Sequence, residues 1–299
     1  FKQKTAYEIS LGLVGSEMCI RDRCKIPMAL TKSAELGSFY VVESGILKVR
    51  NFSEKTELKP VKLPFGTQRF SLTRQTLSPI ATNRAASLWV LPGNLRLVEF
   101  HSKANALTAE SMQIVKQAAK DHGTGILIHN DAQHFSAGVD LNRFADFIER
   151  KAWAEMDSFL NDFQQAVAAL KYAPVPVVGA PSGLSLGGGF EVLLHCDCLL
   201  THANSVLGLV ESGVGVVPGG GGVKTTYQRW YEASQDPKIA AWETWMQVGY
   251  GKTGESPEQA TKLRYFQPDK DKTVMNRDKL ITQATDCLLY TSPSPRDRG

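Results

Sequence analysis

The stretch from Pro174 to Gly222 constrains the fold of this 299-residue chain more than any other. It opens with a short β-branched run, Val175–Val178, which predicts a buried strand. After a turn, three glycines at 187–189 lead into the apolar segment Phe190–Cys196, which predicts a buried helix. Glycines directly before a helix leave N–H groups without intrahelical partners, so this turn is suited to holding a negatively charged oxygen.

Two carboxylates lie in apolar surroundings beside glycine turns. Glu191 follows Phe190 in the first turn of the predicted helix, and Glu211 follows Leu207–Val210 just before a second glycine cluster. A lone first-turn Glu on a solvent-exposed face would only favour the helix dipole, and that interpretation stays open for Glu191. Two buried carboxylates are what paired acid and base chemistry requires, so we expect both in one site.

At this point the residues resemble a known family. The segments LSLGGGFEVLLHCD and VLGLVESGVGVVPGGGG resemble the enoyl-CoA hydratase/isomerase (crotonase) superfamily. In that pattern a GGG turn precedes a Glu, an Asp closes the helix, and a second Glu follows twenty residues after the first. Glu191, Asp197 and Glu211 occupy these positions here. The resemblance implies an α/β fold, a crotonase-like superhelix of repeated ββα units with a truncated C-terminal helical region.

A second segment, HFSAGVDL at residues 134–141, resembles the Phe-x-x-Gly-x-Asp loop of the same family. In that loop the residue after the glycine, here Val139, donates one N–H to an oxyanion, and Gly188 supplies the other. An early loop of the family that meets the CoA moiety resembles the Asn-Ala-Leu segment that starts at Asn105. The further substrate-binding residues implied by the resemblance are Ala137, Asp140, Leu141, Asn105 and Ala106.

The resemblance implies an enoyl-CoA hydratase that adds water across the 2,3 double bond of enoyl-CoA thioesters in fatty-acid β-oxidation. Glu191 would deprotonate the attacking water, and Glu211 would protonate the α-carbon. We expect burial to raise at least one of the two pKa values, so that an acid and a base coexist near neutral pH. CoA enters as part of the substrate, and no cofactor is expected in this chain. An enoyl-CoA isomerase or another acyl-CoA enzyme of the superfamily is the alternative.

Two other motifs compete with this interpretation. The segment Gly183–Gly187 matches the G-x-S-x-G nucleophile elbow of serine hydrolases and follows a predicted strand. That fold places its catalytic His late in the chain, whereas the last of the six histidines is His202, so a serine hydrolase remains a remote alternative. The nearby His and Cys side chains do not have the spacing of tetrahedral metal ligands, and we expect no metal; they are His195, Cys196, Cys198 and His202.

Composition excludes several classes of partner. The chain is 42% hydrophobic and 21% charged with a net charge of +4, and it has no basic run and no membrane-length apolar stretch, so neither nucleic acid nor a membrane is implied. Five cysteines, an odd number, indicate a reducing compartment, and we expect a cytoplasmic protein. By resemblance, its partners are the acyl-CoA thioester and either further copies of the chain or a thiolase.

The sequence also predicts a division along the chain. Residues 1–23 and 287–299 resemble translated sequencing-adapter sequence, and the chain begins with Phe, so we expect non-native ends. Residues 24–84, with a hairpin and a proline-containing linker at 58–66, resemble the joint in bacterial fatty-acid oxidation proteins. They predict the end of a missing upstream dehydrogenase, which would bind NAD. The hydratase core is predicted at 85–235 and a C-terminal helical region at 236–286.

Within these regions the sequence pattern predicts individual elements. Strands are expected at 87–91, 95–100 and 125–129, the first two joined by a Pro-Gly-Asn turn. Helices are expected from a cap at Thr108 or Ser111 to about Ala119, at 153–171, after Gly222, at 256–265 and at 277–285. Alternating strands and helices favour layered α/β architecture.

Overall fold

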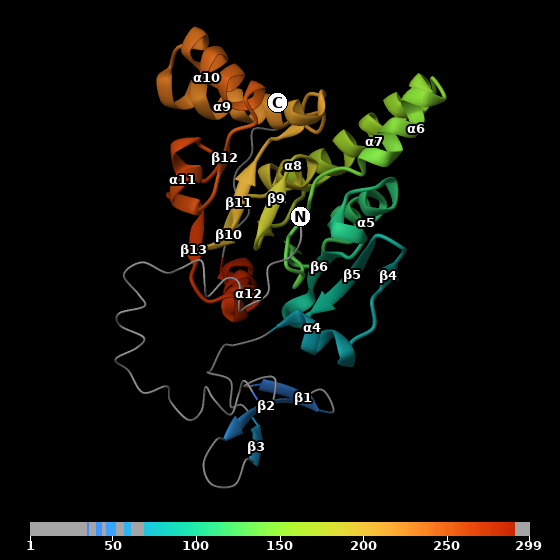
Figure 1. Cartoon of the computed structure of the whole chain (residues 1–299), viewed down its shortest axis with the longest axis vertical. Coiled ribbons are helices and arrows are strands. Elements are labelled where there is room, and N and C mark those ends of the chain that lie inside the picture. The colour runs from blue at the N-terminus through green and yellow to red at the C-terminus, as the bar shows by residue number, and fades with distance from the viewer. Residues whose placement is uncertain (1–34, 36–39, 44–45, 52–56, 61–68, 291–299) are drawn as a thin grey trace. The chain divides into compact units, whose positions relative to one another are not determined.

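The computed structural model describes residues 35, 40–43, 46–51, 57–60 and 69–290, and it divides into two compact units, 1–64 and 65–299 (Figure 1). In the first unit, β1 (Tyr40–Glu43), β2 (Ile46–Asn51) and β3 (Glu57–Pro60) form an antiparallel sheet in that order. The predicted hairpin is present. The third strand takes in residues 58–60, which the sequence assigned to an extended linker, and the rest of that linker lies outside the described residues.

The second unit is built around a seven-stranded sheet in the order β13-β10-β8-β7-β6-β5-β4. The three strands β4, β5 and β6 pair antiparallel, and the pairs from β6 to β13 are parallel. The predicted strand pair around the Pro92–Asn94 turn is confirmed as β5 and β6. The strand bounds are β4 (Ala81–Thr82), β5 (Ala86–Leu91), β6 (Leu95–Phe100), β7 (Ile126–Ile128), β8 (Val177–Gly179), β10 (Cys198–His202) and β13 (Lys272–Val274).

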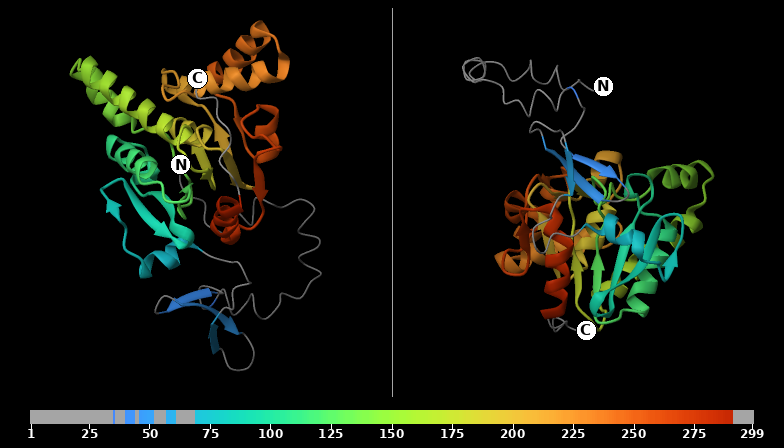
Figure 2. Two further views of the ribbon diagram at one scale, coloured as in Figure 1. Left: turned by 180° about the vertical axis from the view of Figure 1, so that it is seen from behind. Right: turned by 90° about the horizontal axis from the view of Figure 1, so that it is seen from below.

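Helices cover both faces of this sheet, which is the usual setting for parallel strands. Side chains alternate along the strands, so Ile126 and Ile128 of β7 join one core cluster and Leu127 joins the other. The first cluster packs under α5 (Ala109–Lys120) and α7 (Trp153–Lys171), and the second packs against α12 (Leu280–Tyr290). Figure 2 shows the ribbon of the helices and the sheet from two further sides.

The chain then alternates between the large sheet and a small one. From β8 it enters β9 (Leu184–Leu186) and α8 (Gly188–Leu194), and from β10 it enters β11 (Val206–Gly208) and α9 (Gly222–Ser234). The strands β9 and β11 pair in parallel, and β12 (Thr253–Gly254) completes the small sheet in the order β12-β11-β9. These repeats confirm the predicted α/β fold of ββα units.

Several helices match the prediction and others do not. The helix α7 has the predicted bounds, and α5 begins with a capping box in which Thr108 and Ser111 bond reciprocally. One helix, α6 (Leu141–Glu149), escaped prediction, and α10 (Pro237–Gly249) lies in the predicted C-terminal helical region, where no bounds of its own were predicted for it. The start of α10 does carry a signal, because Asp236 caps it and proline occupies the first turn.

The C-terminal helical region predicted at 236–286 contains strands as well as helices. It holds α10 and α11 (Pro257–Lys262), but also β12 and β13, and β13 joins the edge of the large sheet beside β10. The helix α12 runs past residue 286 to Tyr290, and Leu288, which is 3% exposed, packs in the second core cluster. Within the described ranges, no helix combines the length and the apolar character needed to cross a membrane.

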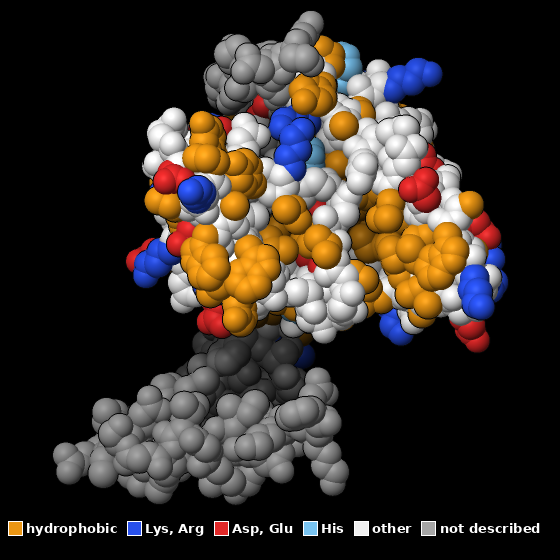
Figure 3. All heavy atoms as spheres, turned by 90° about the horizontal axis from the view of Figure 1, so that it is seen from above, with side chains coloured by type: hydrophobic (Ala, Val, Ile, Leu, Met, Phe, Trp, Pro, Cys, Tyr) orange, Lys and Arg blue, Asp and Glu red, His pale blue; other side chains and the backbone are white. Residues whose placement is uncertain are grey.

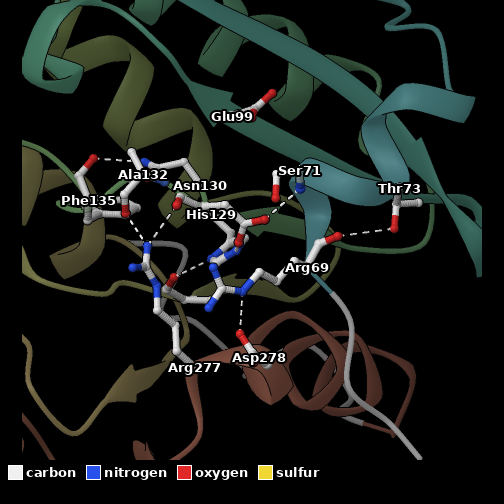
Figure 4. A network of polar contacts seen from close by, with 12 residues as sticks. Arg69, Ser71, Thr73, Glu99, His129, Asn130, Ala132, Phe135, Arg277 and Asp278 are labelled. Carbon is white, nitrogen blue, oxygen red and sulfur yellow. Dashed lines mark hydrogen bonds and ion pairs between the residues drawn. The ribbon is translucent and has the colours of Figure 1, made fainter. Parts of the chain in front are cut away.

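A polar network holds the two ends of the second unit against the middle of its sheet (Figure 4). The backbone N–H of Ser71, in α4 (Phe70–Thr73), donates to the Asp131 carboxylate at 2.6 Å. The other oxygen of Asp131 lies 3.1 Å from Nε2 of the buried His129, whose Nδ1 lies 2.7 Å from the Ala180 carbonyl oxygen. Arg277, just before α12, donates to the Asp131 carbonyl oxygen. Asp131 therefore connects α4, β7 and the entry to α12.

Replacing Asp131 by asparagine should lower the free energy of unfolding by about 1–3 kcal/mol at neutral pH, because hydrogen bonds to a charged group are lost. Although burial opposes ionisation of Asp131, the bonds from His129 and Ser71 prevail and lower its pKa from 3.8 to about 2. A depressed carboxyl pKa adds stability above the unfolded-state value and loses it as the pH falls towards the folded-state value. The difference between wild type and variant should therefore shrink below pH 4 in urea denaturation, whereas the exposed Asp162→Asn should show little change.

Candidate active site

A cavity of about 620 Å³ opens where α6, α7, the start of α8 and the loop after β11 meet. Its lining includes both predicted catalytic carboxylates, Glu191 and Glu211. Most of its other walls are apolar side chains from α6, α7 and residues 210–217. Segments that are far apart in the sequence therefore line one cavity, in which two acidic side chains lie beside an apolar surface.

Glu191 lies on the all-buried helix α8 and is only 2% exposed. The interpretation that places it on a solvent-exposed helix face is therefore wrong. Its Oε1 accepts the backbone N–H groups of Gly220 and Gly222, both at 2.8 Å. Burial raises the pKa of Glu191 to about 7, a rise to which the nearby Glu211 adds and which the two N–H donors partly offset. This carboxyl can thus change its protonation state near neutral pH.

Glu211 begins the short 3-10 helix Glu211–Val214 and faces the same cavity. Both of its carboxyl oxygens are shielded from solvent and accept no well-formed hydrogen bond within the described residues. Burial raises its pKa, and the nearby N–H groups of Val210 and Glu211 itself offset this only in part. A carboxyl that is shielded and poorly solvated in this way favours its protonated form.

The turn before α8 brings the backbone close to the neighbouring loop. Gly187 has φ 53° and ψ −132°, a conformation that side chains strongly disfavour, and a Cβ there would lie 3.2 Å from Glu211 Oε1. A Cβ on Gly188 would lie 2.5 Å from Val139 Cγ2 and 3.5 Å from its backbone nitrogen. In the described part of the chain, the N–H groups of Val139 and Gly188 donate to no protein acceptor. Two unpaired donors thus border the cavity beside the carboxyl pair.

The structure distributes the other predicted site residues over three places. Ala137 and Leu141 line the same cavity as the carboxylates. Asp140 caps α6 by accepting the Asn142 N–H and faces a separate cavity of about 530 Å³. Asn105 is 5% exposed and donates to the His134 carbonyl oxygen, and Ala106 accepts the Ser102 hydroxyl. These last three residues do not line the cavity of the two carboxylates.

Sequence reasoning missed two features of this site. It assigned no role to the glycine cluster after Glu211, although the N–H groups of Gly220 and Gly222 hold Glu191. A Cβ at Gly220 would lie 2.0 Å from Phe163 and 2.8 Å from Glu191 Oε2, so this close approach needs glycine. It also missed that Phe159 and Phe163, spaced i,i+4 on α7, form a wall of the cavity.

Residues of the competing motifs have structural roles. Ser185 of the G-x-S-x-G segment sits inside β9 and is 0% exposed, so it does not stand on the exposed strand-to-helix turn that a nucleophile elbow requires. His195 ends α8 with its Nδ1 2.7 Å from the Glu191 carbonyl oxygen, and burial lowers its pKa to about 4. Asp197, the Asp of the family pattern, accepts the N–H of Val177 and fixes the end of α8 to β8. Each of these contacts is internal to the fold.

Comparison with known proteins places this site in a family context. Residues 95–232 match the sequence profile of the enoyl-CoA hydratase/isomerase family. Over 250 residues, 83% of this chain and 31% of the relative, the sequence is 30% identical to a Bacillus subtilis (strain 168) protein named "Probable 3-hydroxyacyl-CoA dehydrogenase". Over 90 residues, 30% of this chain and 25% of the relative, it is 34% identical to human mitochondrial methylglutaconyl-CoA hydratase. The chain spans less than a third of the length of either relative.

Solved structures share the fold. An enoyl-CoA hydratase from Polaromonas sp. JS666 superposes with a TM-score of 0.57 at 20% identity, covering 68% of this chain and 75% of the other. At this identity the likeness concerns the architecture, and it confirms the crotonase-like fold that the sequence motifs predicted.

Replacing Glu211 by glutamine should lower the pKa of Glu191, because the Glu211 charge is one of the causes that raise it. Carboxyl ¹³C NMR titration of wild type and variant would follow this directly. The exposed Glu258→Gln, on α11, should leave the pKa of Glu191 in place. An unchanged Glu191 titration in Glu211→Gln would contradict the electrostatic coupling of the two groups.

Proposed function

We propose that this chain, whose residues 95–232 match the enoyl-CoA hydratase/isomerase family, hydrates the 2,3 double bond of enoyl-CoA thioesters in fatty-acid β-oxidation. The observation that carries the proposal is the pair of buried carboxyls, Glu191 and Glu211, in one cavity with two unpaired backbone donors. An isomerase needs the same thioester activation, and the pair of acidic groups favours hydration because water addition requires both a base and an acid.

The thioester oxygen would be held by the N–H groups of Val139 and Gly188. By drawing electron density onto this oxygen, the two donors make the conjugated β-carbon electrophilic, and they stabilise the charge on the oxygen of the enolate that forms when water adds. Donors already fixed by the backbone need no reorganisation during the reaction, and losing one such donor typically costs about 3–4 kcal/mol of transition-state stabilisation. The absence of a side chain at Gly188 lets the thioester approach the main chain.

The two carboxyls would divide the proton transfers. Glu191, held by Gly220 and Gly222 N–H groups, takes a proton from the water that attacks the β-carbon. Glu211 gives a proton to the α-carbon. Their unlike surroundings support this division, since hydrogen bonds stabilise the Glu191 carboxylate whereas the Glu211 carboxyl lacks comparable donors.

The CoA part of the substrate would extend from the cavity mouth over the loops that carry the remaining predicted residues, Asn105, Ala106 and Asp140. The proposal also places this chain within a longer fatty-acid oxidation protein. It is supported by the length of the relatives and by the name of the Bacillus subtilis protein, of which the chain spans 31%. An NAD-dependent dehydrogenase part, a homo-oligomer or a thiolase partner belongs to that wider proposal.

The variants Glu191→Gln and Glu211→Gln should each lower kcat for crotonyl-CoA hydration by about 10²–10⁴-fold, because each removes a positioned proton donor or acceptor. The decay of the conjugated thioester absorbance measures the rate in the full-length chain. Unchanged circular dichroism would show that the variants remain folded, and Glu258→Gln should retain wild-type activity. Wild-type-like hydration by either variant would overturn the assigned roles, and double-bond migration without hydration would favour the isomerase.

The pH dependence follows from the direction of the pKa shifts. The base form of Glu191, whose pKa is raised to about 7, gains population as the pH rises, so kcat/KM should increase through the neutral range. Burial raises the pKa of Glu211 as well, and once both carboxyls of the pair are ionised no proton donor is left, so the profile should then fall. Apparent values belong to the coupled pair. A rate constant that stays flat from about pH 6 to 8 would contradict this assignment.

A further inference from the structure

The walls of the cavity beyond the carboxyl pair are apolar and extend to solvent. Four large apolar side chains that line it are more than half exposed: Ile148 at 53%, Trp153 at 58%, Val214 at 55% and Val217 at 72%. They lie on α6, α7 and the loop after β11, and hydrophobic side chains gather over this top face of the molecule (Figure 3). Apolar surface that lines an open cavity in this way favours an apolar ligand that continues outward.

The charged side chains that line this cavity all have one sign. Among its lining residues the only titratable side chains are Glu191 and Glu211, and no Lys, Arg or His lines it. The two arginines of α6 and its C-terminal end are engaged elsewhere. Arg143 lines the neighbouring cavity and lies over the Phe147 ring, and Arg150 bonds both Asp146 and Glu155. A carboxylate on the ligand would therefore meet acidic groups and no counter-ion.

From these walls and charges we infer the substrate class: uncharged acyl chains of medium or long length. Acyl groups that end in a carboxylate are rejected. The inference rests on the proposed function for the position of the thioester, at Val139 and Gly188. From there the acyl chain of the substrate would run from the carboxyl pair along Phe144 and Met156 to the exposed side chains at the cavity mouth. Each methylene that enters the cavity leaves water, and each should tighten binding by up to about fourfold.

Isothermal titration calorimetry of the full-length chain with saturated acyl-CoAs tests this without requiring turnover. Decanoyl-CoA should bind at least about tenfold more tightly than butanoyl-CoA, because several more methylenes are buried. Glutaryl-CoA should bind at least about tenfold more weakly than hexanoyl-CoA, because its terminal carboxylate would be desolvated without a partner. Equal affinities along the series, or glutaryl-CoA binding as well as hexanoyl-CoA, would overturn the inference.

A matched pair of substitutions locates the effect. Ile148→Lys places a cation at the cavity mouth, whereas Ile239→Lys places one at a similarly exposed site, 48% exposed, on α10 and away from this cavity. The first should reduce the ratio of decanoyl- to butanoyl-CoA affinity and improve glutaryl-CoA binding relative to hexanoyl-CoA. The second should move neither ratio. Equal shifts in both variants, or none in Ile148→Lys, would contradict the assignment of this wall.

Binding and hydration are measured separately, so failure of the inferred substrate class can be distinguished from failure of the proposed reaction. Chain-length-dependent binding together with no hydration of crotonyl- or 2-decenoyl-CoA would support the substrate class and overturn the hydratase. Hydration of both thioesters, together with equal affinities for short and long acyl-CoAs, would support the hydratase and overturn the substrate class.

Discussion

The site depends on keeping a carboxyl inside the core. Glu191 is almost wholly buried on a helix whose every residue is buried, and an unpaired carboxylate there would be costly. Two backbone N–H groups, from Gly220 and Gly222, meet one of its oxygens at hydrogen-bond distance. They stabilise the ionised form and so partly offset burial, which raises the pKa of Glu191 to about 7. The same contact draws the loop after β11 onto α8 and closes one side of the cavity.

The fold supplies this contact by alternating between two sheets. Each ββα repeat takes the chain from the large sheet to the small one and then into a helix, so β9 and β11 lie side by side. The turn at Gly187 and the segment before Glu211 leave the same edge of these neighbouring strands. Parallel pairing of β9 and β11 thus brings the two acidic residues into one cavity although twenty residues separate them.

The rest of the cavity selects its ligand because no positively charged side chain is among its lining residues. Its acidic pair already occupies the polar part of the surface, and its other walls are apolar side chains of α6, α7 and the loop at 210–217. Buried charge without a partner costs free energy, whereas apolar area leaving water gains it. The same walls that exclude water from the carboxyls therefore also favour uncharged acyl chains.

Local patterns in the sequence determined the bounds of α7, the capping of α5, the β5–β6 pair and the candidate carboxyls at 191 and 211. The ββα fold was predicted through the resemblance to the family, which the GGG turn, Glu191, Asp197 and Glu211 carry. Only the tertiary structure decided that β13 joins the large sheet and that glycines 220 and 222 hold Glu191. The reason is physical: capping and periodicity act between near neighbours in the chain, whereas these contacts depend on how distant segments pack.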